Sequence, residues 1–222
     1  MPTPPEFRRA PVDHPILEVL AARWSSRAID PDRPLDLPTL HRLLEAARWT
    51  PSSGNAQPWR YVVFDERVPA ALEHARDCLS RGNAWARQAP ALLLTIAVRS
   101  WPPRHDKPPR DGHNPHAVHD VGAASFALML QATAEGLVVH QMSGFDRELA
   151  REVFAIPADA EPMAMIALGH PGDPTQLPPD LAEREARPRV RRPVRETAFL
   201  GGFDGPGLAL DPPAERPSGG LG

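Results

Sequence analysis

The sequence predicts an α+β fold. Stretches with apolar residues every three or four positions alternate with short β-branched or aliphatic runs, a pattern typical of helices and strands in alternation. The chain has 222 residues, of which 41% are hydrophobic, enough for one good-sized core. The N-terminal end is rich in proline, and the C-terminal end is rich in glycine and proline. We therefore expect a Pro-rich arm over 1–13, one domain over 14–200 and a Gly/Pro-rich tail over 201–222.

The first half of this domain predicts two helices followed by a strand, a helix and a strand. Pro38, near the start of the second stretch, suits the first turn of a helix. The strands are indicated by the runs "RYVVFD" and "ALLLTIAV". The predicted elements are helices over 14–24, 36–49 and 68–79 and strands over 60–65 and 91–98.

The second half predicts a Pro-rich loop at 101–116 and then one long apolar helix. Asn114 is expected to be its N-cap, Pro115 its first residue and Gly136 its end. Because small or apolar residues occupy most faces of this helix, we expect it at the centre of the fold or at a subunit interface. The alternation is completed by a strand over 137–142, a helix over 146–154 and a strand over 162–169.

Composition narrows the possible functions. The net charge of −3 gives no field that would attract nucleic acid, and no apolar run is long enough to cross a bilayer. The N-terminal residues lack the apolar segment of a secretory signal, and the solitary Cys78 cannot form an intrachain disulfide. We therefore expect a cytoplasmic protein that binds neither nucleic acid nor membranes.

Two basic segments have the spacing of an anion site. In an extended chain, Arg23, Ser25 and Arg27 point to the same side and would present two guanidinium groups and a hydroxyl to a phosphate. Arg189 and Arg191 repeat this alternate spacing. The alternative for both segments is that these arginines are simply exposed to solvent.

A third segment, "TPSSGNAQPW" at 50–59, contains two hydroxyls, two carboxamides and a glycine between prolines. The carboxamides of Asn55 and Gln57 each offer a donor and an acceptor, which match the mixed edge of a pyrimidine-like ring. Gly54 would let backbone amides approach a ligand closely. A polar turn is the alternative interpretation.

Together, these segments resemble the FMN-dependent nitroreductase superfamily. Its members carry an Arg-x-Ser-x-Arg opening, a Pro-Ser-Ser-x-Asn-x-Gln-Pro-Trp loop and a basic pair before a late proline. The loop motif is matched at Pro51, Ser52, Ser53, Asn55, Gln57, Pro58 and Trp59. The segment "EGLVVHQMSGFD" at 135–146 is similar to the family's stretch beside the flavin ring. The resemblance covers about residues 14–200.

The resemblance implies a nitroreductase-like fold, with a central, mostly antiparallel sheet flanked by helices. It also implies an intertwined homodimer with FMN bound at the subunit interface. The implied phosphate ligands are Arg23, Ser25, Arg189 and Arg191, and Arg27 would lie beside the flavin ring. The implied site is completed by Pro51, by Ser52, Ser53, Asn55 and Gln57 from the partner subunit, and by the backbone N–H groups of Ser143 and Gly144.

The implied activity is transfer of electrons from NADH or NADPH, through FMN, to a small organic acceptor such as a nitroaromatic or a quinone. No side chain is expected to act as a nucleophile or general base, and Cys78 is expected in the core. Alternatives left open are an oxidase that acts on its own flavin, a flavin-free regulatory or interaction protein of the same fold, and a metal site at His113, His116 and His119.

Three parts of the sequence depart from the family pattern. His140 and the residues after it stand where the family often has an acidic residue or proline, which affects contacts with the ring face. Asn83 or Arg87 could supply the amide or basic group expected before the second strand. The loop at 101–116 lies where the family varies its substrate-covering elements, so a lid is one interpretation of it.

Overall fold

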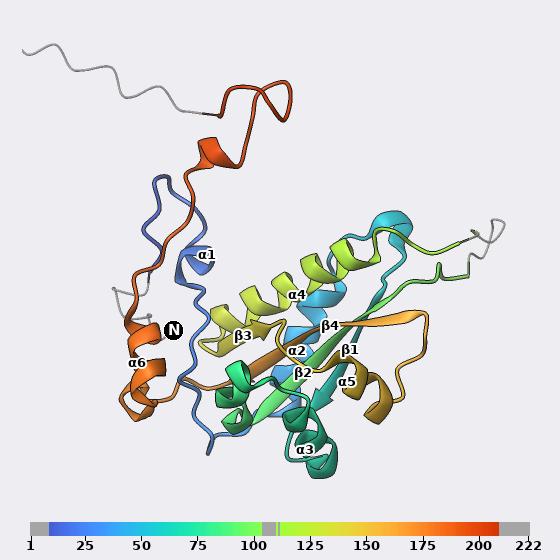
Figure 1. The fold of residues 1–222 in the computed structure, drawn as a ribbon, viewed down its shortest axis with the longest axis vertical. Helices are drawn as coiled ribbons and strands as arrows, with labels where there is room; N and C mark the ends of the chain where they lie inside the picture. The colour runs from blue at the N-terminus through green and yellow to red at the C-terminus, as the bar shows by residue number, and fades with distance from the viewer. Residues whose placement is uncertain (1–8, 104–109, 111, 209–222) are drawn as a thin grey trace, which may run out of the picture. The chain divides into compact units, whose positions relative to one another are not determined.

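In the part of the chain that the structure describes, four antiparallel strands form one sheet in the order β1-β2-β4-β3 (Figure 1). The structure is a computed structural model that describes residues 9–103, 110 and 112–208. The strands are β1 (Trp59–Phe64), β2 (Ala91–Val98), β3 (Val138–Met142) and β4 (Ala160–Gly169). Each neighbouring pair is antiparallel, which confirms the predicted α+β class and the mostly antiparallel sheet.

Helices cover both faces of this sheet. The described helices are α1 (Glu18–Ala22), α2 (Leu37–Arg48), α3 (Pro69–Asp77), α4 (Ala117–Ala134), α5 (Arg147–Val153) and α6 (Pro179–Ala186). Short 3-10 turns include η2 (Ser53–Asn55), η3 (Arg81–Gln88) and η4 (Pro174–Gln176). One apolar cluster joins α2 and α4 to the sheet, and a second joins α3 and α5 to its opposite face.

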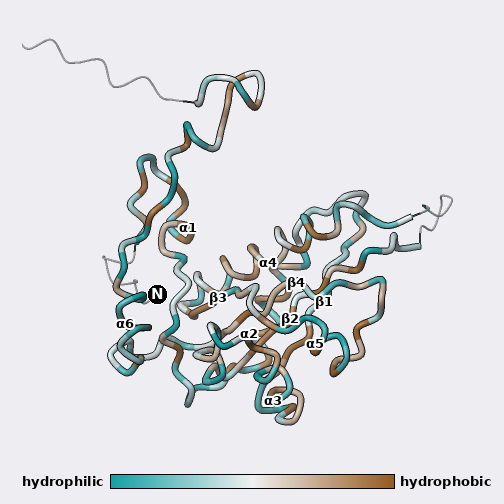
Figure 2. The backbone as a smooth tube through the Cα atoms, in the orientation of Figure 1, coloured by the Kyte–Doolittle hydropathy of each residue, from teal (hydrophilic) through white to brown (hydrophobic). Residues whose placement is uncertain are grey.

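Strand β2 belongs to both apolar clusters. Leu92 and Leu94 pack with the cluster under α3 and α5, whereas Leu93 and Ala97 pack with the cluster under α2 and α4. Successive side chains of a strand point to opposite faces, so a strand covered on both sides needs a continuous apolar run. This explains why "ALLLTIAV" shows no polar alternation, and Figure 2 shows the apolar character of the central strands.

The structure confirms the predicted C-terminal end of α4 but not its predicted N-terminal start. Gly136 has a φ of 75° and ends the helix as predicted: its N–H donates to the carbonyl of Thr133, and Leu137 N–H donates to that of Ala132. The predicted N-cap at Asn114 is wrong. The helix begins at Ala117, because the Asn114 side chain accepts from His116 N–H and closes a turn before the helix.

The predicted first helix is also wrong at both ends, since only Glu18–Ala22 is helical. Ile16 and Leu17 are exposed, so the apolar pattern that predicted a longer helix does not face the core there. After Ala22, the chain turns away from helical geometry and makes hydrogen bonds to a distant helix instead. Tertiary contacts therefore override the local helical spacing. Helix α6 and the turn η3 were not predicted.

Residues 188–222 form a second contact unit, separate from 1–187. Within its described part, η5 (Val194–Glu196) is followed by a turn in which the rings of Phe199 and Phe203 lie 5.6 Å apart. Large apolar side chains are exposed in this unit, namely Val190, Val194, Phe199, Leu200, Phe203 and Leu208. The domain boundaries predicted between residues 13 and 14 and between residues 200 and 201 stay predictions. Among the described helices, none is long and apolar enough to span a membrane.

Candidate functional site

The segment that follows α1 carries the first predicted phosphate ligands. Arg23 Nη1 donates a hydrogen bond to Ser25 Oγ at 3.0 Å, and both side chains are half-buried. The two residues are thus brought together, as alternate positions of a non-helical segment can be. A guanidinium and a hydroxyl next to each other are donors of the types that bind phosphate oxygens.

The intervening residues of this segment are held by Glu185, near the end of α6. Its carboxylate accepts hydrogen bonds from Trp24 Nε1 at 3.1 Å and from the Ser26 hydroxyl. It also accepts from the backbone N–H of Arg27 at 3.2 Å. The side chain of Glu185 is buried, with only 2% of the residue exposed. The segment therefore has one face bonded to a buried carboxylate and another that carries Arg23 and Ser25.

Arg27 lies between this carboxylate and an aromatic pair. Its Nη1 is 4.0 Å from Glu185 Oε2, and its guanidinium carbon is 5.8 Å from the ring centroid of Trp85 in η3. Trp85 in turn packs against the ring of His140 in β3, with centroids 4.7 Å apart. A cation near the face of an indole is stabilised by the ring quadrupole. Turn η3 therefore links the Arg27 side chain to β3.

His140 is tied to the same segment through its ring. Nδ1 lies 3.1 Å from the backbone carbonyl of Ser26, and since a carbonyl only accepts, Nδ1 carries the proton. Burial, together with the positive charge of Arg27, lowers the pKa of His140 to about 4. The imidazole is therefore neutral near pH 7, and Nε2 is left with a lone pair.

The turn after β3 contains the predicted ring-binding residues Ser143 and Gly144. The carbonyl of Gly144 accepts from Ser80 N–H at 3.2 Å and from Asn83 Nδ2 at 2.8 Å. A Cβ on Gly144 would lie 2.7 Å from Asn83 Nδ2 and 2.8 Å from Ser80 Oγ, so a larger residue here would have to displace these two side chains. Of the two candidates before β2, Asn83 lies at this turn.

Arg87, the other candidate, is directed toward α3. Its guanidinium pairs with Asp77 at 3.1 Å and with Glu73 at 3.7 Å. Both carboxylates belong to α3, and all three side chains are exposed. These ion pairs explain the position of the Arg87 side chain on the protein surface, and no bound ligand is needed to explain it.

The predicted loop at 51–57 is organised by hydrogen bonds to itself and to α4. The Ser52 hydroxyl accepts from Gln57 N–H at 3.0 Å, and Gln57 Nε2 donates to Asn55 Oδ1 at 3.2 Å. Ser53 N–H donates at 2.9 Å to Oδ2 of Asp120, a residue of the first turn of α4 that is only 4% exposed. Asn55 and Gln57 are exposed, and so is Pro51.

One residue of the predicted loop at 101–116 contacts the 51–57 loop. Gly54, with a φ of 56°, has so little space above its Cα that a Cβ there would lie 2.9 Å from Arg110 Nη1. The Arg110 guanidinium carbon also lies 4.3 Å from the ring centroid of Trp101. Residues 104–109 and 111 of the predicted lid lie outside the described residues.

The structure does not bring all the predicted ligands together within one chain. The 51–57 loop contacts the first turn of α4, whereas the Arg23–Arg27 segment contacts β3, which follows the end of that helix (Figure 1). An 18-residue helix is about 27 Å long. Arg189 and Arg191 belong to the second contact unit. Their grouping with Arg23 stays a prediction.

Comparison with known proteins places this arrangement in a family. The model of the Nitroreductase family matches residues 20–170, which is most of the chain. The chain belongs to the nitroreductase family. This confirms the predicted recognition and the nitroreductase-like fold.

Relatives of this nitroreductase-family chain span most of its length. A crystal structure of an oxidoreductase containing FMN is 34% identical, covers 88% of this chain and 96% of its own, and has a TM-score of 0.80. The NADH dehydrogenase of Thermus thermophilus is 30% identical over 72% of this chain and 89% of its own. The 5,6-dimethylbenzimidazole synthase of Rhodospirillum rubrum is 29% identical over 72% of this chain and 85% of its own.

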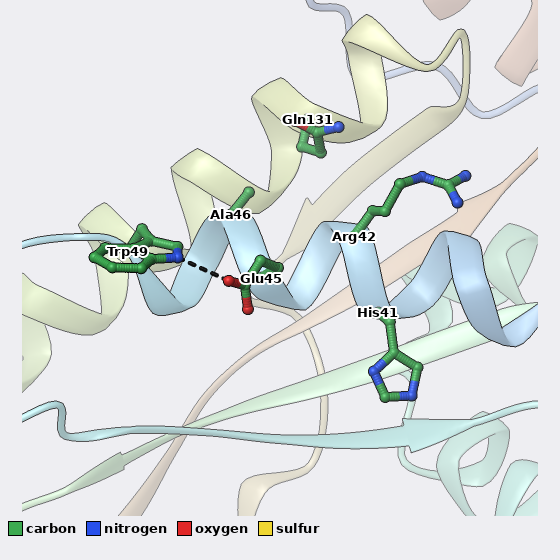
Figure 3. Close-up of a pocket in the computed structure, with 6 residues that line it drawn as sticks. All are labelled: His41, Arg42, Glu45, Ala46, Trp49 and Gln131. Atoms are coloured by element: carbon green, nitrogen blue, oxygen red, sulfur yellow. Dashed lines mark hydrogen bonds between the residues drawn. The ribbon is translucent and has the colours of Figure 1, made fainter.

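Besides the family's motif positions, the chain has a surface groove between α2 and α4 (Figure 3). Its volume is about 510 Å³, and its lining residues are His41, Arg42, Glu45, Ala46, Trp49 and Gln131. The Trp49 ring is largely solvent-exposed, and its Nε1 donates to Glu45 Oε1 at 2.7 Å. None of the predicted flavin ligands lines this groove.

Sequence reasoning missed Glu185, Trp85 and Asp120, which hold the nitroreductase-family motif residues in place. Glu185 lies in an Arg- and Glu-rich helix, and nothing in its local pattern marks it as buried. Asp120 had a usable signal, because an acidic residue in the first turn of a helix commonly accepts from nearby backbone N–H groups. Among the described residues, no group of three or more histidine, cysteine or acidic side chains could hold a metal ion.

Proposed function

We propose that this protein is an FMN-dependent oxidoreductase that passes electrons from NADH or NADPH to a small organic acceptor such as a nitroaromatic or a quinone. The observation that carries the proposal is the position of η3 between two motif segments. Trp85 contacts Arg27 and His140, and Asn83 contacts Gly144. The phosphate-type donors and the Ser143–Gly144 turn are therefore neighbours in one chain. The FMN content of the related crystal structure supports this proposal.

The side chains present fit FMN in charge and shape. Arg23 and Ser25 supply a guanidinium and a hydroxyl to the phosphate, and each charge-assisted hydrogen bond contributes about 1.5–3 kcal/mol. Gly144 lies close to Asn83 and Ser80, and without a side chain of its own it would let the ring approach the backbone of this turn. Arg189 and Arg191 would add charge to the phosphate end. These residues bind and orient the cofactor.

FMN, when bound, supplies the hydride and electron transfer. The residues of this chain position and tune it. Arg27 brings a positive charge to the site, while His140 is neutral near pH 7 and adds none. Cys78 is buried in the core as predicted, and burial with Asp146 and Asp77 nearby raises its pKa to about 11, so the thiol is not a nucleophile near pH 7.

We further propose that the active form is a homodimer in which each FMN is held by both subunits. The separation of the 51–57 loop from Arg23 within one chain supports this, because a second copy could supply the loop. Helix α4, whose residues are mostly small or apolar, also leaves the apolar side chains of Val118 and Phe126 exposed. Such a surface is typical of a subunit interface. In this arrangement Ser52, Ser53, Asn55 and Gln57 of the partner subunit complete each site.

The experiment that tests the function is an absorbance spectrum of the purified protein before and after anaerobic addition of NADH or NADPH. We expect the oxidised-flavin bands, and we expect either donor to bleach them. Addition of a quinone or a nitroaromatic should then restore the bands. A protein that takes up no FMN contradicts the proposal. Absence of FMN would fit the flavin-free regulatory alternative, whereas a flavin-loaded protein that neither donor bleaches would contradict the proposed electron donors.

A second candidate is the oxidase that acts on its own flavin, which the family resemblance leaves open. The 29% identity to a protein named 5,6-dimethylbenzimidazole synthase supports keeping a second activity in view. The two functions differ in the fate of the cofactor. In the first, flavin absorbance recovers fully after each cycle of reduction and reoxidation. In the second, admission of oxygen to the reduced protein leads to permanent loss of flavin absorbance. Measuring the flavin absorbance that remains after one cycle therefore distinguishes the two functions.

A further inference from the structure

We propose that Glu185 is a positioning residue for the phosphate end of the flavin. Its buried carboxylate fixes the segment from Trp24 to Arg27 so that Arg23 and Ser25 present their donors to the phosphate together. This inference rests on the proposed function, and it goes beyond it by assigning a role to a residue outside the family's motif segments.

The bonds of Glu185 are spread along the segment. Oε1 accepts from Trp24 Nε1 and from the Ser26 hydroxyl, and Oε2 accepts from the backbone N–H of Arg27. Contacts to two side chains and one backbone group fix both the course of the chain and the side on which each residue lies. Since Trp24 and Ser26 turn toward Glu185, the side chains of Arg23 and Ser25, which alternate with them, are left to face elsewhere.

The hydrogen bond from Arg23 to Ser25 shows that the side chains of these two residues lie together. Arg23 Nη1 lies 3.0 Å from Ser25 Oγ, so the two donors are already adjacent. Ligand sites are tightest when their groups are held in place before the ligand arrives. Glu185 holds the segment in this arrangement through its bonds to Trp24, Ser26 and Arg27. In this proposal it does not contact the ligand.

Burial makes the arrangement sensitive to the charge of Glu185. The carboxylate is 2% exposed and is surrounded by donors, with the Arg27 guanidinium at 4.0 Å. A glutamine has nearly the same volume but replaces one acceptor oxygen by an NH₂ group. Either orientation of the amide would set that group against the N–H of Trp24 or of Arg27. The segment would then lose its anchor without a cavity being created.

The test compares FMN with riboflavin, which is the same ring system without the phosphate. Dissociation constants of both are measured by flavin fluorescence titration for the wild-type protein and for Glu185→Gln. We expect about tenfold or weaker binding of FMN by the variant, and little change for riboflavin. A general loss of structure would weaken both ligands equally, so the ratio of the two constants isolates the positioning role.

Glu183→Gln is the matched control. Glu183 lies on the same helix and pairs with Arg187 at the surface, so this variant removes the same charge without touching the segment. We expect its FMN-to-riboflavin ratio to equal that of the wild type. If Glu185→Gln keeps the wild-type ratio, or lowers both affinities to the same extent, the positioning role is wrong.

Ser26→Ala keeps the inference testable if Glu185→Gln does not fold. It removes one of the donors to Glu185 and should shift the ratio in the same direction by a smaller factor. An unchanged ratio in a folded Ser26→Ala protein overturns the inference. Failure of the proposed function looks different, because the wild-type protein itself would then bind no flavin.

Discussion

The ring of His140 is hydrogen-bonded to the backbone of Ser26, with 3.1 Å between Nδ1 and the carbonyl oxygen. This bond joins β3, which leads to the Ser143–Gly144 turn, to the segment that carries Arg23. Two motif regions more than a hundred residues apart in sequence are thus held by one side chain. Its protonation state has consequences for stability.

We expect the protein to lose stability as the pH falls from about 6.5 to about 4. Folding lowers the pKa of His140 from its usual 6.5 to about 4, so the unfolded chain binds a proton in this window and the folded one does not. The contribution is fully present above pH 6.5 and is lost as the pH falls toward 4. Its size is on the order of 3 kcal/mol. Urea unfolding at several pH values measures it.

His140→Gln is the control for this pH dependence, because glutamine keeps an N–H donor for Ser26 and does not titrate. The free energy of unfolding of the variant should change less between pH 6.5 and pH 4 than that of the wild type. Identical pH profiles for the two proteins would contradict the assignment of this window to His140.

Replacement of Arg23 by alanine should strip FMN from a folded protein. The variant loses a charge-assisted partner of the phosphate, which corresponds to a roughly tenfold to hundredfold rise in the dissociation constant. Arg191→Ala should act in the same direction, and the double variant should bind least. Exposed Arg33 provides the control, since Arg33→Ala removes the same charge elsewhere. Retention of flavin by Arg23→Ala at wild-type affinity would refute its role.

Asn55→Ala should weaken FMN binding less than Arg23→Ala and should shift the flavin absorbance bands, because the carboxamide is assigned to the ring edge.

Mixing the Arg23→Ala and Asn55→Ala proteins tests whether the 51–57 loop comes from the partner subunit. A heterodimer of the two would contain one site with both changes and one intact site, so flavin binding should be partly restored. If both segments act within one chain, mixing restores nothing.

Asp120→Ala should destabilise the protein by about 1–3 kcal/mol and loosen the 51–57 loop. The buried carboxylate accepts from Ser53 N–H at 2.9 Å, and its loss leaves that donor without its acceptor. His119 also contacts this carboxylate, at 3.1 Å, but its side chain is largely exposed. His119→Ala should therefore change the free energy of unfolding by less than 1 kcal/mol. Equal effects of the two variants on urea unfolding would argue against this account.

The sequence predicts the strands and the longest helix well because their signals are local. The continuous apolar run of β2 and the left-handed Gly136 after α4 are both visible in the order of residues alone. The pattern of polar residues likewise located the motif segments at 23–27 and 51–57. What those segments bind is implied by resemblance, and their roles as ligands stay predictions.

The parts that the sequence could not predict depend on contacts between distant residues. Glu185 is buried where Trp24, Ser26 and Arg27 come to it across the fold. The same contacts end α1 at Ala22 and defeat the helical spacing of residues 23–24. Asn114 resembles an N-cap locally, but its side chain closes the preceding turn. Local propensity is weaker than these tertiary hydrogen bonds.

The order of the strands determines which segments of the candidate site are attached to the edges of the sheet. Within the described sheet, β1 and β3 are the outer strands, whereas β2 and β4 are paired on both sides. Outer strands exchange their amide hydrogens through small local openings, and inner strands exchange mainly through global unfolding. The 51–57 loop leads into β1, and β3 leads into the Ser143–Gly144 turn. The two segments that are predicted to bind flavin are therefore attached to the parts of the sheet that can fluctuate while the inner pair stays closed.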